Sequence, residues 1–376
     1  MNSVLIVAGL VLLVVGGEFL VRGAASLARR LGMSSLVVGL TVVAVATSAP
    51  EFAVTLDSVL RGQPDLAVGN VIGSNTANIL LILGVGALVA PLLAPRQLLR
   101  FDLPVMVGIS VLLLLLSLDG RLSTLDGMLL LAVFVAAMVG TVILGRRQGA
   151  DASETDSAGD GEDPGDPDTP VWRSLLFVVL GVAALVGGAQ LLVNGAVAIA
   201  EALGVSSLVI GLTIVAIGTS LPELAATVVA VRRGEFSMAV GNIVGSNIAN
   251  IGLVLGVPTI IAPDGIGVPA SSIALDLPLM IAAALALVIV AVTGGRIIRL
   301  EGAIFIALYL AYIAYMILDS ANHDAQDGFS LVMAGLVLPL LVLVGVISLV
   351  NEVRTRRRSP APDASGVRDA GPPPGP

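Results

Sequence analysis

The sequence predicts an all-α integral membrane protein made of two inverted five-helix repeats, ten core transmembrane helices in all, plus one extra C-terminal transmembrane helix. Three observations support this: a strongly apolar composition, eleven long apolar runs, and a segment that recurs at a constant offset. Of the 376 residues, 56% are hydrophobic and only 12% are charged, whereas soluble domains carry about 25% charged residues. A chain of this composition is suited to lipid as its solvent.

The composition excludes several functional classes. The sequence has no cysteine and a single histidine, His323, so it offers no disulfide, thiolate site or histidine cluster. Eight of its 27 acids lie within 151–168, and the other 19 are balanced by 19 bases, all of them arginine. Nucleic-acid binding needs a basic face, and none is apparent. We therefore expect that the protein is not an enzyme and has neither a prosthetic group nor an obligatory protein partner. We expect it to lie in a lipid bilayer.

The apolar runs set the helix count, because a helix needs roughly 20 apolar residues to cross a bilayer. The first run lacks a basic leader and a cleavage site, which favours a helix over a signal peptide. The predicted spans lie near 3–21, 35–60, 66–90, 103–118, 125–145, 173–198, 207–231, 238–262, 271–292, 300–318 and 329–350.

Arginine placement predicts the orientation, since cytoplasmic loops are enriched in arginine. With the N-terminus outside and the C-terminus cytoplasmic, 17 arginines fall inside and only Arg61 and Arg121 fall outside. We expect a multi-pass protein of the cell membrane. Its predicted divisions are a first repeat (1–147), an acidic cytoplasmic linker (148–171), a second repeat (172–320), the extra helix (321–351) and a disordered cytoplasmic tail (352–376).

The internal repeat is the most informative feature. Residues 39–84 align with 211–256 without a gap, and 27 of 46 positions are identical. Weaker similarity continues outward, where Gly120-Arg121 matches Gly295-Arg296, so the unit contains five helices. An odd number of spans places the second copy upside down. Inverted repeats are typical of secondary transporters, whose site lies at the repeat interface near mid-bilayer.

Both copies place Thr-Ser-x-Pro-Glu inside an apolar helix, ending in Glu51 and Glu223. The proline removes a backbone donor, which frees carbonyl groups around 43–46 and 215–218, and such groups are tolerated at membrane depth only in a cavity or inside protein. A charged residue at the centre of a membrane helix costs about 2.5–3.5 kcal/mol. Two carboxylates at equivalent positions therefore call for a counter-ion.

The neighbouring helices add further oxygen atoms. Ser74 and Asn78 share a helix face at a spacing of four, as do Ser246 and Asn250, whereas Asn75 and Asn247 either line the pocket or bond to neighbouring helices. Carboxylate, hydroxyl, amide and carbonyl oxygens suit hard cations. Two carboxylates balance one Ca²⁺, and several Na⁺ ions or protons can replace it. This interchange is the physical basis of antiport.

Other interpretations start from the same residues. A proton-coupled Ca²⁺ antiporter needs the same carboxylates, and a cation channel would use them for downhill flux. An intramembrane protease ranks last, because the site has no lysine or histidine base. A single Pro-kinked polar helix is often mere packing, but two inverted copies with a carboxylate each are not. Glu18, Asp102 and Asp276 lie near expected helix ends, which indicates capping or snorkelling, and the symmetric placement of Asp102 and Asp276 indicates a role in the fold.

At these residues the sequence resembles the sodium/calcium exchanger membrane family of the calcium/cation antiporter superfamily. The resemblance rests on G-x-T-S-x-P-E, with Ala46 for the glycine in the first copy, and on G-N-x-x-G-S-N-x-x-N at 69–78 and 241–250. It implies exchange of Ca²⁺ for Na⁺ by alternating access. The implied side-chain ligands are Thr47, Ser48, Glu51, Ser74, Asn78, Thr219, Ser220, Glu223, Ser246 and Asn250.

The resemblance also implies backbone carbonyl ligands at Ala44 and Ala216, whereas the proline argument places the freed carbonyls nearest Ala46 and Gly218. The sequence departs from the family at Asn250, where several members carry aspartate. Only two site carboxylates remain, which bears on ion stoichiometry and potassium coupling. Proton-coupled members of the superfamily typically carry G-N-x-x-E in place of T-S-x-P-E. This sequence has T-S-x-P-E, which favours sodium as the counter-ion.

Overall fold

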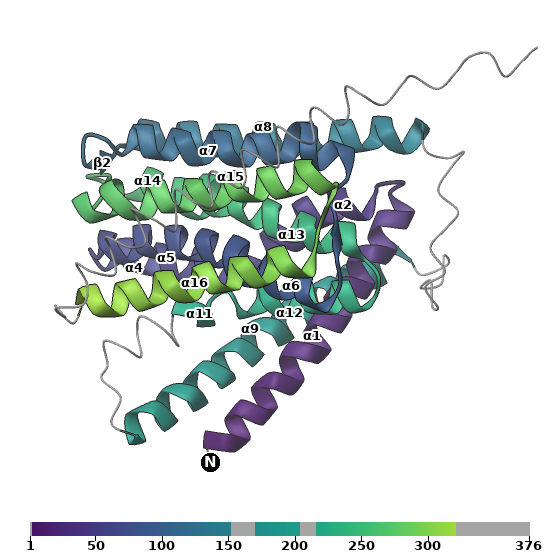
Figure 1. Cartoon of the computed structure of the whole chain (residues 1–376), viewed down its shortest axis with the longest axis horizontal. Helices are drawn as coiled ribbons and strands as arrows, with labels where there is room; N and C mark the ends of the chain where they lie inside the picture. Colours follow the sequence, from purple (N-terminus) through teal and green to yellow (C-terminus); the bar gives the residue numbers. More distant parts are fainter. Residues whose placement is uncertain (1, 152–169, 204–215, 321–376) are drawn as a thin grey trace, which may run out of the picture.

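The computed structural model describes residues 2–151, 170–203 and 216–320. Within these ranges, eight helices are long and apolar enough to cross a membrane, or nine if one bent pair counts as a span. The predicted span 207–231 is described from residue 216. The expected extra helix and tail lie outside the described residues, as does most of the linker. Figure 1 shows the helices as stacked layers, with α1 and α9 crossing them obliquely.

The observed helices follow the predicted spans closely, and several consist of consecutive pieces. Five of these pieces are π-helical turns (η), in which the backbone bonds reach five residues along the chain. The helices are α1 (Asn2–Arg30), α2 (Ser35–Val38), η1 (Gly39–Val43), α3 (Ala44–Thr47), α4 (Ala49–Leu60), α5 (Pro64–Ala77), η2 (Asn78–Ile82), α6 (Leu83–Val89), η3 (Leu98–Asp102), α7 (Leu103–Leu116), α8 (Thr124–Asp151), α9 (Val171–Ala202), α11 (Ala216–Gly218), α12 (Leu221–Arg232), α13 (Phe236–Ala249), η6 (Asn250–Leu255), α14 (Gly256–Ile261), η7 (Ser272–Asp276), α15 (Leu277–Gly294) and α16 (Arg299–Ser320).

Two helices form the centre of the bundle. The most apolar stretch of Pro64–Val89 is 78% buried and that of Phe236–Ile261 is 83% buried, whereas no other long apolar helix among the described residues exceeds 39%. These are the continuous helices α5–α6 and α13–α14. They correspond to each other in the repeat and carry the Ser and Asn residues predicted for the ion site.

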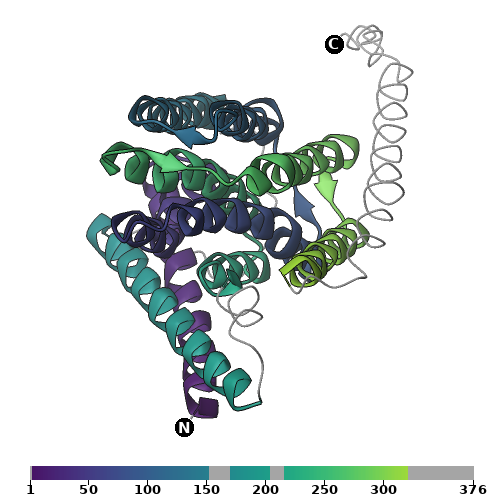
Figure 2. The ribbon, with the colours of Figure 1, turned by 90° about the vertical axis from the view of Figure 1, so that its left-hand side faces the viewer.

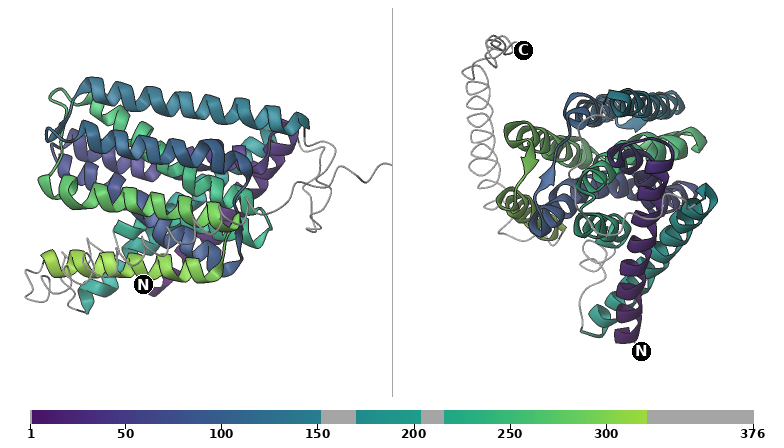
Figure 3. Two further views of the ribbon diagram at one scale, coloured as in Figure 1. Left: turned by 45° about the horizontal axis from the view of Figure 1, so that its top comes forward. Right: turned by 90° about the vertical axis from the view of Figure 1, so that its right-hand side faces the viewer.

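Helices α1 and α9 lie side by side along most of their length (Figure 3, right). Their contact uses glycines spaced by seven residues. A Cβ atom at Gly16 would lie 2.8 Å from the Gly181 carbonyl oxygen, and one at Gly9 would lie 2.7 Å from that of Gly188. Close backbone approach of this kind is how membrane helices pack without a hydrophobic driving force between them. Gly9 and Gly181 are also 172 residues apart, as are Gly16 and Gly188.

Four two-residue strands join the loops at the ends of the bundle, a detail that the all-α prediction lacks. Strand β1 (Leu92–Leu93) pairs antiparallel with β4 (Arg296–Ile297), and β2 (Arg121–Leu122) pairs antiparallel with β3 (Ile266–Gly267). Figure 2 shows the two ladders apart from each other. Each ladder joins a loop of the first repeat to a loop of the second.

The prediction that the acidic residues near helix ends snorkel toward water needs a correction. Asp102 is fully buried rather than snorkelling, and one of its carboxylate oxygens accepts a 2.7 Å hydrogen bond from the Thr141 hydroxyl. Glu18 lies within α1 and forms ion pairs with Arg22 and Arg233, the second of which follows α12. Both acids therefore connect elements of the bundle, Asp102 from a fully buried position and Glu18 from a partly exposed one.

Candidate ion site

The first half of the site is built at a break in the second span. Helix α3 ends at Thr47, α4 begins at Ala49, and the two parts of the span meet at a bend of 43°. Pro50 stands in the first turn of α4, where a missing N–H disrupts no helical bond of that turn. The break thus presents the Thr47 and Ser48 hydroxyls one turn before the Glu51 carboxylate.

The second half repeats this construction. Helix α11 ends at Gly218 and α12 begins at Leu221, with Pro222 in its first turn. Ser220 has φ −90° and ψ 5°, close to the φ −76° and ψ 5° of Ser48. The same sequence therefore produces the same local geometry twice. Ala216 begins α11, and the structure describes its backbone only.

The two breaks meet inside the bundle. Glu51 and Glu223 are both fully buried, and the Ser220 hydroxyl donates a 3.3 Å hydrogen bond to Glu51 Oε1. In the opposite direction, the Thr47 and Ser48 hydroxyls lie toward Glu223, but neither makes a hydrogen bond of normal geometry to its carboxylate. The two carboxylates are close enough for their charges to interact.

The central helices contribute four further buried polar side chains. Ser74, Asn78, Ser246 and Asn250 are each at most 3% exposed. The Ser246 hydroxyl donates a 3.4 Å hydrogen bond to the Ala44 carbonyl oxygen in the first repeat. Predicted site residues of the two repeats therefore contact each other at Ser220–Glu51 and at Ser246–Ala44.

The Ala44 carbonyl group of the first repeat contacts the second repeat. It accepts hydrogen bonds from the Ser48 N–H at 3.0 Å, the Thr47 hydroxyl at 3.3 Å and the Ser246 hydroxyl. The proline argument considered only the lost helical bond, which points to Ala46. Contact with Ser246 instead places the Ala44 carbonyl beside the predicted ligands.

Unpaired polar atoms are concentrated at the candidate site. Buried polar groups nearly always have a hydrogen-bond partner, yet eleven buried side-chain atoms of the described residues have none within the protein. Nine of the eleven belong to the predicted ion ligands. They are Ser48 Oγ, Glu51 Oε2, Ser74 Oγ, Asn78 Oδ1 and Nδ2, Thr219 Oγ1, Glu223 Oε1 and Oε2, and Asn250 Oδ1. Eight of the nine are oxygens, which fits a hard cation as cargo.

Two asparagines that the sequence argument did not single out hold the broken helices in place. Asn70 Nδ2 donates to the Glu51 carbonyl oxygen at 3.1 Å and to Thr55 Oγ1 at 2.9 Å. Asn242 accepts a 3.2 Å bond from the Thr47 hydroxyl and donates to Thr227 Oγ1 at 3.3 Å. Both asparagines and both threonines recur at the offset of 172, so pairing of repeated polar residues could have found them.

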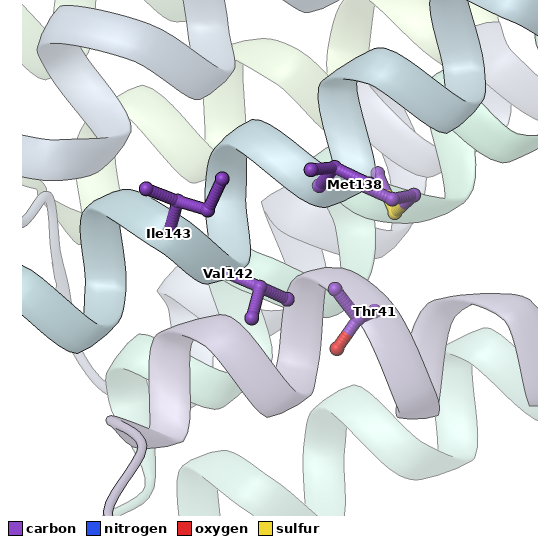
Figure 4. Close-up of a pocket in the computed structure, with 5 residues that line it drawn as sticks. Thr41, Met138, Val142 and Ile143 are labelled. Carbon is purple, nitrogen blue, oxygen red and sulfur yellow. The ribbon is translucent and has the colours of Figure 1, made fainter.

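An apolar hollow elsewhere has a different character. It lies between η1 and α8 and is lined by Thr41, Met138, Val139, Val142 and Ile143 (Figure 4). The Thr41 hydroxyl is bonded to the Val37 carbonyl oxygen of its own helix at 2.6 Å. With no carboxylate in its lining, this hollow offers nothing to bind a cation and is separate from the ion site.

Both the sequence and the structure resemble those of known proteins. The sequence matches the family described as "Sodium/calcium exchanger protein" over residues 1–143 and 173–318. The chain belongs to the sodium/calcium exchanger family. The structure resembles that of the sodium-calcium exchanger NCX_Mj with a TM-score of 0.72 and 32% identity, covering 83% of this chain and 98% of the other.

Sequence relatives give the same family. The candidate antiporter CaxA of Alkalimonas amylolytica is 41% identical over 321 residues, which is 85% of this chain and 99% of CaxA. The sodium/calcium exchanger MaX1 of Methanosarcina acetivorans is 33% identical over 345 residues, covering 84% of this chain and 98% of MaX1. The protein is thus a multi-pass membrane cation antiporter of this family and not an enzyme.

Proposed function

We propose that this protein exchanges Ca²⁺ for Na⁺ by alternating access, at one pocket that contains both Glu51 and Glu223. The observation that carries the proposal is the meeting of the two carboxylates, one from each repeat, with Ser220 bonded to Glu51 across the repeat boundary. Because one pocket holds both charges, a divalent cation and a set of monovalent cations compete for it. Such competition couples the two fluxes.

The proposed ligands supply only oxygen atoms to the cargo. Two carboxylates match the charge of one Ca²⁺, and its usual six to eight ligands can come from carboxylates, hydroxyls, amide oxygens and carbonyls. The proposed set is Ala44, Thr47, Ser48, Glu51, Ser74, Asn78, Ala216, Thr219, Ser220, Glu223, Ser246 and Asn250. The unpaired oxygen atoms within this set support the assignment.

The inverted ten-helix arrangement is part of the proposal, and the strand pairs support it. Strand β2 corresponds to β4 in the repeat, since Gly120-Arg121 matches Gly295-Arg296. Strand β4 pairs with β1, which precedes α7, whereas β2 follows α7. The two ends of the spanning helix α7 lie on opposite sides of the membrane, so β1 and β2 do as well. Because β4 pairs with β1, the strand β2 and its copy β4 lie on opposite sides of the membrane. Parallel repeats would place them on the same side.

The orientation follows from the arginines. We place the N-terminus outside, so that the β1–β4 ladder is cytoplasmic and the β2–β3 ladder is external. Arg96, Arg100 and Arg299 then lie near the cytoplasmic ladder, as the preference for arginine in cytoplasmic loops requires.

Sodium is the proposed counter-ion, and protons are the alternative. MaX1 is named a sodium/calcium exchanger, and NCX_Mj is described as a sodium-calcium exchanger that was soaked with Na⁺ together with Sr²⁺ or Ca²⁺. Buried carboxylates also bind protons, so proton coupling uses the same residues.

The deciding experiment uses purified protein in vesicles with the sodium and pH gradients set independently. Sodium-loaded vesicles in sodium-free medium should take up labelled calcium, with or without a pH gradient. Glu51→Gln and Glu223→Gln should each abolish the uptake, whereas Glu201→Gln, at an exposed acid near the end of α9, should not. Uptake that follows the pH gradient and ignores sodium would overturn the sodium assignment. Downhill calcium flux that needs neither gradient would indicate a channel.

A further inference from the structure

Two buried amides join the repeats beside the proposed pocket. Asn75 lies in α5 and Asn250 begins η6, and each is at most 1% exposed. Asn250 Nδ2 donates a 3.0 Å hydrogen bond to Asn75 Oδ1. Asn250 is among the proposed ligands, but Asn75 is not.

A backbone carbonyl determines which way the Asn75 amide faces. Asn75 Nδ2 donates a 3.2 Å hydrogen bond to the Asn247 carbonyl oxygen in α13. A carbonyl oxygen can only accept, so the NH₂ group of Asn75 must face it. The Asn75 side chain then presents its oxygen, and not its nitrogen, to Asn250.

The orientation of Asn250 follows from that of Asn75. Because Asn75 Oδ1 can only accept, Asn250 must present its NH₂ group to it. This leaves Asn250 Oδ1 unpaired, as one of the nine unpaired atoms of the site. A cation binds an amide oxygen and is repelled by an NH₂ group, so the bond to Asn75 leaves free the atom that the cargo needs.

The equivalent position in the other half is arranged differently. Asn247, the counterpart of Asn75, donates to the Ile243 carbonyl oxygen of its own helix at 2.7 Å. Both amide atoms of Asn78, the counterpart of Asn250, are unpaired. The orienting bond therefore exists on one side of the pocket only, although the sequence is symmetric there.

We propose that Asn75 is a positioning residue that orients the Asn250 oxygen toward the transported cation and adapts position 250 to a neutral amide. An ionised aspartate at 250 would set a carboxylate oxygen against Asn75 Oδ1, two acceptors with no hydrogen between them. Asn75 could accommodate it only by turning its amide and losing the bond to the Asn247 carbonyl. The inference rests on the proposed exchange of Ca²⁺ at this site.

The test measures the KM for Ca²⁺ and the maximal rate of exchange in vesicles. Asn75→Leu removes the acceptor and should raise the KM by roughly 10- to 100-fold, because one interaction with a charged group has about this value. The maximal rate should change much less. Asn75→Asp keeps an oxygen for Asn250 and, as the neutral acid, a donor for the Asn247 carbonyl, so it should restore much of the affinity.

A control and a mutant cycle separate positioning from packing. Thr76 is the next residue in α5, is fully buried, and bonds only to the Ile72 carbonyl oxygen of its own helix at 2.9 Å. Thr76→Val should leave the KM within about twofold, as expected for an intrahelical bond of small net value. Asn250→Ala should raise the KM strongly in the wild type but little in the Asn75→Leu background, because the two residues act together.

Several results would overturn the inference while leaving exchange itself intact. An unchanged KM in Asn75→Leu, no recovery in Asn75→Asp, or equal effects of Asn250→Ala in both backgrounds would each do so. Loss of exchange in the wild type would instead contradict the proposed function. If Asn75→Leu does not fold, as judged by its elution as a single species, Asn75→Ala replaces it under the same criteria.

Discussion

Replacing Glu223 with glutamine should change the stability of the protein in opposite directions, depending on whether calcium is present. Both carboxylate oxygens of Glu223 are buried without a hydrogen bond, and the Glu51 carboxylate is nearby. Without a cation, the Glu223 carboxylate must either stay charged beside Glu51 or take up a proton, and the neutral amide avoids both costs. The melting temperature of Glu223→Gln in a calcium chelator should therefore exceed that of the wild type.

With calcium the effect reverses, and its size can be worked out. Leaving a buried charge without its partner costs about 3–5 kcal/mol, which corresponds to a rise in the Kd of roughly 100-fold or more. Calcium at about 100 times the wild-type Kd stabilises the wild type by about 2.7 kcal/mol. At the same concentration, a 100-fold weaker variant gains only about 0.4 kcal/mol. The calcium-induced shift in melting temperature should nearly vanish.

The assay is thermal unfolding of the detergent-purified protein, with and without calcium. Glu201→Gln is the control, because this acid is exposed at the end of α9, and it should behave as the wild type in both conditions. The reasoning is refuted if Glu223→Gln melts lower than the wild type in chelator and still shows the full shift with calcium. Glu223 would then be a structural residue.

Two further predictions concern the scaffold. Gly16→Leu should destabilise the protein by about 1–3 kcal/mol, because its Cβ atom would lie 2.8 Å from the Gly181 carbonyl oxygen. Thermal unfolding should show this loss of stability. Gly187→Ala is the control and should show no comparable loss, because a Cβ atom at Gly187 would meet no atom within 4 Å. Asp102→Leu leaves the buried Thr141 hydroxyl without its acceptor, which should lower the stability by about 1–3 kcal/mol. Asp102→Asn keeps an acceptor oxygen and should be more stable than Asp102→Leu. Equal melting temperatures for the two variants would contradict the role of Asp102 as the acceptor for Thr141.

Much of the fold was predictable because the membrane imposes a length on every span. The helix α1 begins and ends within nine residues of its predicted span, and the second span covers 35–60 as predicted. The meeting of the two glutamates was predictable for a related reason. Glu51 and Glu223 are too costly in a membrane to be incidental twice, and their buried positions side by side agree with that argument.

What the sequence did not predict depends on contacts between distant helices. Asp102 was predicted to lie at a helix end, but it is buried and accepts a hydrogen bond from Thr141, which is 39 residues away in the sequence. The Ala44 carbonyl stands out only once Ser246 is seen beside it. The link from Asn75 to Asn250 spans 175 residues, and it breaks a symmetry that the sequence itself shows. The repeat shows which polar residues recur, but it does not show that Asn75 pairs with Asn250 while its counterpart Asn247 bonds within its own helix.

The central claim is that Glu51 and Glu223 share one divalent cation, and counting bound calcium tests it most directly. Equilibrium binding of labelled calcium to the purified protein, in sodium-free buffer, should give one tightly bound ion per wild-type chain. Glu51→Gln and Glu223→Gln should each bind none at that concentration, because each removes half of the same site. A variant that retained one tightly bound calcium would show that the remaining carboxylate has a site of its own, and the shared pocket would be contradicted.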